Sequence, residues 1–223
     1  MCFSATASFT AGAAISLVGI AAIKTRQHRA QLLFACIPFI FGIQQLTEGL
    51  LWIQLRSHAE GLVAHFATHV FLFFAQVVWP FWVPLSILLL EKREQRSVLQ
   101  KILVALGGAL SLYFIYCQYL YPVDSAIEGK HIVYYREYPS SFDLTTIVIY
   151  AVVTILPSFL SHIPRMWILG SSIALSFLIT SVFYQHYILS VWCFFAAIIS
   201  LSIYTILRGL NRKKKSQMKA LRL

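Results

Sequence analysis

The chain has 223 residues, of which 59% are hydrophobic and 12% are charged, and its formal net charge is +10. This composition and a mean hydropathy of +0.74 exclude a soluble globular domain and indicate an integral membrane protein. The four cysteines include no CxxC pair, so the sequence contains neither a zinc ribbon nor a thioredoxin-like motif.

The apolar runs predict a polytopic, all-α membrane protein. Each run is long enough to cross a bilayer as a helix, and helical hydrogen bonding satisfies its backbone groups in lipid. We therefore predict a single seven-helix transmembrane bundle over residues 1–207. The predicted spans are Ala5–Ile23, Gln31–Ile53, Leu62–Leu90, Ser97–Leu120, Leu144–Ser161, Met166–Phe183 and Tyr187–Leu207.

The positive charges predict the orientation of these spans. Lys and Arg gather in the loops after the first, third and fifth predicted spans and in the tail, residues 208–223. Because cytoplasmic loops carry an excess of Lys and Arg, we expect the N-terminus outside and the C-terminus in the cytoplasm. The basic tail predicts contact with anionic lipid and not with nucleic acid.

The longest connection between predicted spans, residues 121–143, falls on the predicted outer side. Glu128-Gly129-Lys130 is typical of a turn, and His131–Tyr135 has the β-branched and aromatic residues of a short strand. One interpretation is a hairpin that lies over the outer mouth of the bundle as a lid. The other is a solvated loop whose tyrosines lie at the membrane interface.

A carboxylate within a predicted span is the main signal of function. Glu48 lies just over one helical turn from the outer end of the second span. An ionisable group at this depth is costly and marks a site that contains a partner. Gln45 and Trp52 share its helix face by their spacing, so we expect both to line the site.

Histidines of the neighbouring spans are predicted to lie at the same depth. His65 and His69 have the i, i+4 spacing by which one helix offers two imidazoles to one metal ion. With Glu48 and His186 they would suit a divalent ion such as zinc. Gln76 and Ser190 would extend the lining inward. The alternative is a structural pair of Glu48 with one histidine, the other histidines lying among the lipid headgroups.

The N-terminal residues Met1-Cys2-Phe3-Ser4-Ala5 carry a resemblance. They resemble the opening of an uncharacterised family of bacterial multi-pass membrane proteins, and the similarity continues through Gln44–Trp52. The resemblance implies a protein of the bacterial inner membrane and no particular activity. Cys2 and Ser4 would lie at the outer mouth, where the Cys2 thiolate could bind a metal or act as a nucleophile; the alternative is a short interfacial lead-in.

The predicted layout is also similar to that of the alkaline ceramidase and adiponectin-receptor superfamily of seven-helix zinc hydrolases. That superfamily has an H-x3-H motif on its last helix, where this chain has only His186. The ceramidases hold zinc near the cytosolic side, whereas Glu48 and the histidines are predicted near the outer side. The similarity is one of layout alone.

Two functions follow from the predicted site. The first is a metal-dependent hydrolase that acts on a lipid or other amphiphile from the outer leaflet, with Glu48 as metal ligand or general base. The alternative is a non-enzymatic binding or transport protein, in which Glu48 and the histidines hold a cation or a proton.

Overall fold

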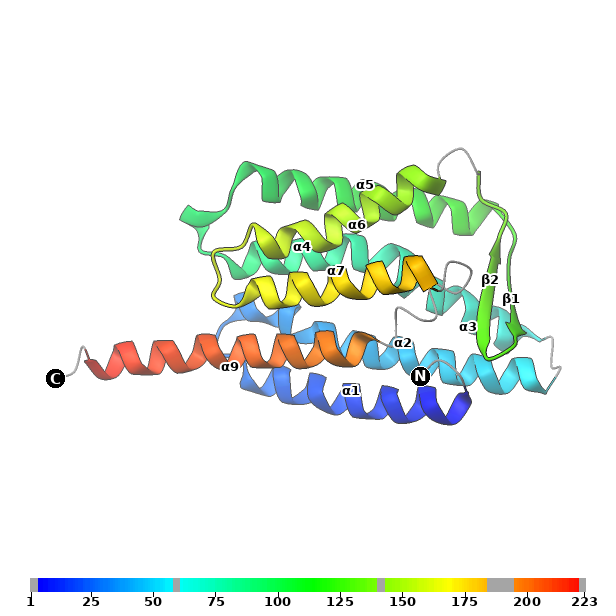
Figure 1. Cartoon of the computed structure of the whole chain (residues 1–223), viewed down its shortest axis with the longest axis horizontal. Helices are drawn as coiled ribbons and strands as arrows, with labels where there is room; N and C mark the ends of the chain where they lie inside the picture. The colour runs from blue at the N-terminus through cyan, green and yellow to red at the C-terminus, as the bar shows by residue number, and fades with distance from the viewer. Residues whose placement is uncertain (1–3, 58–60, 140–142, 184–194, 221–223) are drawn as a thin grey trace.

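The computed structural model describes residues 4–57, 61–139, 143–183 and 195–220, and this part of the chain is mainly helical (Figure 1). The elements are α1 (Ala5–Thr25), the 3-10 helix η1 (Arg29–Gln31), α2 (Leu32–Arg56), α3 (Leu62–Leu72), the π-helix η2 (Phe73–Val78), α4 (Trp79–Leu90), the 3-10 helix η3 (Arg93–Gln95), α5 (Val98–Leu120), strands β1 (Val123–Glu128) and β2 (His131–Arg136), α6 (Asp143–Phe159), α7 (Met166–Phe183) and α9 (Ala196–Ala220).

Within the described residues, 5 helical segments are long and apolar enough to cross a membrane. They are Ala5–Thr25, Arg29–Arg56, Leu62–Leu90, Val98–Leu120 and Met166–Phe183. Leu144–Phe159 is a shorter apolar helix. The predicted span Tyr187–Leu207 lies partly outside the described residues, and α9 covers its second half. The prediction of a helical membrane protein is confirmed.

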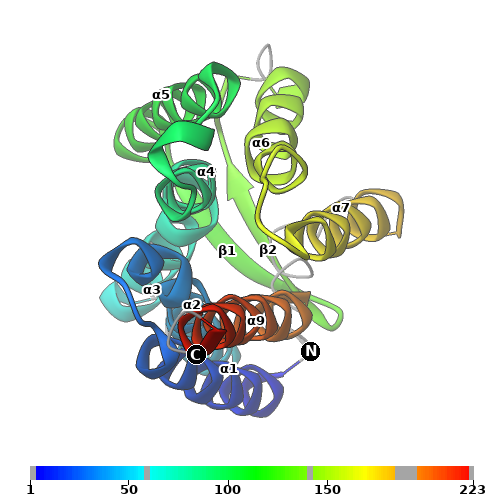
Figure 2. The same cartoon turned by 90° about the vertical axis from the view of Figure 1, so that its left-hand side faces the viewer.

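Seen along the long axis, the helices surround a central region and the hairpin crosses one end of the bundle (Figure 2). We call this end the hairpin end. The opposite end, beyond which α9 extends, is the tail end (Figure 1). The chain passes from the tail end to the hairpin end in α2, and it returns through the continuous segment of α3, η2 and α4.

Helices α1 and α2 pack in close backbone contact because glycines line their interface. A Cβ atom on Gly19 would collide with the backbone of Phe39, and one on Gly42 would collide with Ser16. Small residues at such spacings let membrane helices approach closely and gain van der Waals contact. This interface fixes the position of α2, which carries Glu48.

A π-helix interrupts the third span immediately before Trp79 and Pro80. Proline has no N–H to continue the helical hydrogen bonds, and π-helical turns accommodate such breaks. Other helices supply donors to its carbonyls: Tyr150 Oη donates to the Ala75 carbonyl at 2.6 Å, and Ser111 Oγ donates to that of Val77 at 2.7 Å. The interruption therefore ties the third span to α5 and α6.

The hairpin is an antiparallel pair that joins Val123 to Arg136 at one end and Glu128 to His131 at the other. Gly129 occupies the turn with φ +62, a conformation that glycine adopts without strain. Alternation along the strands buries one face, on which Ile132 is fully buried. The pairing confirms that residues 123–136 form a hairpin, and its strands lie across the hairpin end of the bundle.

Candidate functional site

One ridge of α2 carries the polar residues of the site. Gln44, Glu48, Trp52 and Arg56 follow one another at intervals of four residues and so lie on one face of the helix. The first three are buried, with Glu48 0% exposed, whereas Arg56 is exposed. Gln45 Nε2 donates a hydrogen bond to Glu48 Oε2 at 2.8 Å. The sequence prediction that Glu48 and Gln45 lie together inside the protein therefore agrees with the geometry.

Trp52 and Arg56 extend this ridge to the hairpin end. The Arg56 guanidinium carbon lies 5.3 Å from the centroid of the Trp52 ring, which is a cation–π contact. Trp52 is 1% exposed, and its indole N–H has no hydrogen-bond partner among the described residues. The ridge thus changes from a buried carboxylate to an exposed cation over just more than two helical turns.

The two histidines of α3 lie next to each other. Their ring centroids are 4.2 Å apart, and His69 Nδ1 lies 3.0 Å from the His65 carbonyl oxygen. His65 is exposed and His69 is half-buried. The predicted pairing of the two imidazoles on one helix face is therefore present.

The predicted metal cluster is not formed by the part of the chain that the structure describes. Within it, no three side chains of His, Cys, Asp or Glu are grouped so that they could hold a metal ion. Glu48, His65 and His69 therefore do not make a three-ligand site. His186, the fourth predicted ligand, and the predicted residues Cys2 and Ser190 lie outside the described residues.

A large pocket lies at the hairpin end, between the end of α2, the start of α3 and strand β1. Its volume is about 840 Å³. Ligand pockets commonly measure about 300–1,000 Å³, so this one has the size of a small-molecule site. The pocket is lined by Gln54, Leu55, Arg56, Gly61, Leu62, Ala64, His65, Thr68, Val123, Asp124, Ser125, Ala126 and Ile127.

Specific contacts hold the hairpin over this pocket. Thr68 and Ser125 hydroxyls are hydrogen bonded at 2.8 Å, and the rings of Phe71 and Tyr134 stack with centroids 4.7 Å apart. Both contacts join α3 to the hairpin. These contacts fasten the hairpin to α3 beside the pocket, and its role as a lid stays a prediction.

The charges of the pocket come from two distant parts of the chain. Arg56 contributes a cation and His65 an imidazole from the helices, and Asp124 contributes a carboxylate from the hairpin. One Asp124 carboxylate oxygen accepts a hydrogen bond from the Ser125 backbone N–H at 2.7 Å, which orients it. Arg56 and Asp124 were absent from the sequence-predicted site. In the sequence, the only signal for Arg56 was that it is one of the few basic residues on the predicted outer side of the membrane.

Two predicted lining residues have other contacts. Ser4 caps α1, since its hydroxyl accepts a hydrogen bond from the Ala7 backbone N–H at 3.2 Å. Gln76 lies in the π-helix, and its side-chain oxygen accepts from Gln118 Nε2 at 3.3 Å and from the Tyr138 hydroxyl at 3.2 Å. Burial raises the pKa of the Tyr138 hydroxyl above its ordinary value, which favours the protonated form that donates this hydrogen bond.

From its helices and its pocket, the protein is a helical membrane protein with a hairpin-covered pocket at one end of its bundle. Residues 1–220 match the model of a family of unknown function, DUF6629. The chain belongs to this family. No match was found among curated proteins or among solved structures.

Proposed function

We propose that this protein is a non-enzymatic membrane protein that binds a small zwitterionic amphiphile in the pocket beneath the hairpin. The observation that carries the proposal is the composition of the pocket wall, where aliphatic side chains such as Leu55, Leu62 and Ile127 alternate with Arg56 and Asp124. Aliphatic groups stabilise an apolar body, and a few placed polar groups fix its orientation.

The pair of opposite charges determines the class of head group. Arg56 would bind a phosphate or carboxylate through charge-assisted hydrogen bonds, and Asp124 would bind an amine. A ligand with only one sign of charge would form an ion pair with only one of these two side chains. A zwitterionic head group satisfies both, and His65 adds a further hydrogen-bonding group beside them.

The proposed membrane topology has seven spans, with the hairpin end outside the cell. Basic residues at the tail end support this orientation, among them Arg26, Arg29, Lys92, Arg96 and Arg165. The pocket would then open near the outer headgroup layer of a bacterial inner membrane, where amphiphiles are concentrated. The basic tail would lie against anionic lipid on the cytoplasmic side.

The metal-dependent hydrolase has less support. It needs a metal ion held by Glu48 and the histidines, yet the described residues offer no three-ligand group. A hydrolytic zinc site commonly uses three protein ligands and an open position for water. Elemental analysis of the purified protein beside its Glu48→Ala and His69→Ala variants would test it, with stoichiometric metal in the wild type as the supporting result.

Binding can be measured with a soluble probe. We would titrate the protein, reconstituted in nanodiscs, with dihexanoylphosphatidylethanolamine below its micelle concentration and follow heat by calorimetry. Arg56→Ala and Asp124→Asn should each weaken binding about tenfold, because each leaves one ligand charge unpaired.

Matched substitutions at the tail end provide the controls. Lys101 and His162 are exposed there, far from the pocket. Lys101→Ala and His162→Ala should bind the probe as the wild type does. Equal affinity in Arg56→Ala, Asp124→Asn and the two controls would refute the proposed site, and so would absence of binding to the wild type.

A further inference from the structure

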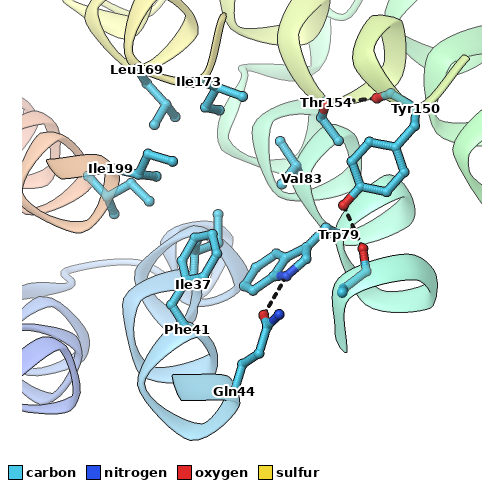
Figure 3. Close-up of a pocket in the computed structure, with 12 residues that line it drawn as sticks. Ile37, Phe41, Gln44, Trp79, Val83, Tyr150, Thr154, Leu169, Ile173 and Ile199 are labelled. Carbon is cyan, nitrogen blue, oxygen red and sulfur yellow. Dashed lines mark hydrogen bonds between the residues drawn. The ribbon is translucent and has the colours of Figure 1, made fainter. Parts of the chain in front are cut away.

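A second cavity lies inside the bundle, apart from the pocket beneath the hairpin. Figure 3 shows it between side chains of α2, α4, α6, α7 and α9. Its volume is about 50 Å³. Most of its wall is aliphatic, with Ile37 on α2, Val83 on α4, Leu169 and Ile173 on α7, and Ile199 and Ile203 on α9.

The polar side chains at this cavity are hydrogen bonded within the protein. Trp79 Nε1 donates to Gln44 Oε1 at 2.8 Å, and the Tyr150 hydroxyl donates to the Ala75 carbonyl at 2.6 Å (Figure 3). The Thr154 hydroxyl donates to the Tyr150 carbonyl at 2.7 Å. These bonds occupy the hydroxyl and indole donors at the cavity, and the rest of the wall is aliphatic, so the wall favours an apolar occupant.

The size of the cavity narrows the choice of occupant. It exceeds the roughly 10–15 Å³ that one water needs, but its apolar wall gives water few partners. It is far smaller than the roughly 300 Å³ of a typical ligand pocket. It therefore fits only a narrow apolar group, such as the last carbons of an alkyl chain.

We infer that this cavity binds the end of a hydrocarbon chain. Trp79 lies near the middle of the segment Leu62–Leu90, the depth at which acyl chains end in a bilayer of about 30 Å. An empty apolar cavity costs stability in proportion to its volume, and a chain end that fills it removes that cost. The site is independent of the pocket beneath the hairpin.

Trp79 can report on the occupant because it forms part of the cavity wall. It stacks on Phe41 with ring centroids 3.9 Å apart and is only 5% exposed. Bromine atoms quench tryptophan fluorescence at short range. We would replace the other four of the 5 tryptophans by Phe and place this single-Trp79 protein in nanodiscs whose acyl chains carry bromine near their ends.

Two arms of the experiment distinguish a lipid acyl chain from a free alkyl compound as the occupant of the cavity. The first uses the brominated lipid, and the second adds 1-bromohexane to nanodiscs of unbrominated lipid. Quenching of Trp79 in either arm supports the inference, and the arm in which it occurs identifies the source. A protein whose single tryptophan is introduced by Leu175→Trp, at a residue 58% exposed on α7, reports ordinary contact with lipid.

Cavity-filling variants test whether the quencher enters the cavity. Ile173→Phe and Ile199→Phe add volume to its wall and should lower Trp79 quenching about twofold or more. Leu178→Phe, on the exposed side of α7, is the matched control and should leave quenching unchanged. The inference is overturned if Trp79 is not quenched while Leu175→Trp is, or if both cavity-filling variants are quenched as strongly as the control.

Discussion

The pocket beneath the hairpin and the cavity inside the bundle differ in both size and chemistry, although α2 contributes to both. The pocket has a volume of about 840 Å³ and is lined by Arg56, His65 and Asp124 among aliphatic groups. The cavity has about 50 Å³, and its polar groups are bonded to one another. A site for a charged head group therefore lies at the end of the bundle, where water can solvate its charges, and the interior suits hydrocarbon.

Breaking the packing of α1 against α2 should produce the largest effect, because α2 contributes residues to both regions. Gly42→Leu places a side chain against Ser16 and forces α1 away from α2, which positions Gln44 and Arg56. We expect a loss of more than about 3 kcal/mol in the free energy of unfolding, measured by denaturation in detergent.

Gly209→Ala is the matched control for this prediction, because a Cβ at that position has no neighbour within 4 Å. It should be neutral or slightly stabilising, since alanine favours a helix by about 1 kcal/mol over glycine. Equal stability of the two variants would contradict the close packing of α1 against α2.

Glu48 lies between the two regions and should give the next largest effect. Glu48→Leu removes the acceptor of the Gln45 amide in a fully buried place and should cost about 2 kcal/mol. Glu48→Gln retains an acceptor oxygen and should cost less. Thermal unfolding in detergent measures the difference, and a Glu48→Leu protein more stable than Glu48→Gln would contradict the assigned hydrogen bond.

A change at the hairpin should affect the pocket and leave the interior cavity intact. Thr68→Val removes the hydroxyl that is bonded to Ser125 and should cost about 1 kcal/mol. Hydrogen exchange should become faster in β1 and β2. Thr205→Val, at an exposed residue on α9, is the control and should leave hairpin exchange unchanged. Faster exchange in both variants would show that the Thr68 contact is not specific to the hairpin.

The smallest effect concerns pH. Burial lowers the pKa of His131 below its ordinary value of 6.5. A base whose pKa is lowered by folding binds fewer protons when folded than when unfolded, so its contribution to stability is complete above pH 6.5 and falls as the pH drops below that value. Proteolysis at Lys130 should accelerate between pH 7.5 and pH 5.5, by at most about twofold. His131→Phe should remove most of this acceleration; an unchanged pH dependence in that variant would assign it to another group.

Much of the fold could be predicted from local sequence. A long apolar segment in lipid must bond its own backbone groups, so the runs at Ala5 and Leu62 predicted helices regardless of their neighbours. The hairpin was one of two interpretations of its segment, supported by Gly129 and the β-branched residues after it, which act within a few residues. The helix face shared by Glu48 and Gln45 followed from helical periodicity alone.

Only the tertiary structure decided which faces meet. The π-helix places Gln76 against Gln118 and Tyr138, and periodicity gave no sign of it because its contacts come from residues far along the chain. Likewise, Arg56 and Asp124 line the same pocket only because the hairpin packs against α3 through Thr68 and Ser125. Helices form by local hydrogen bonds, whereas a site forms by contacts between distant segments, whose pairing no local pattern encodes.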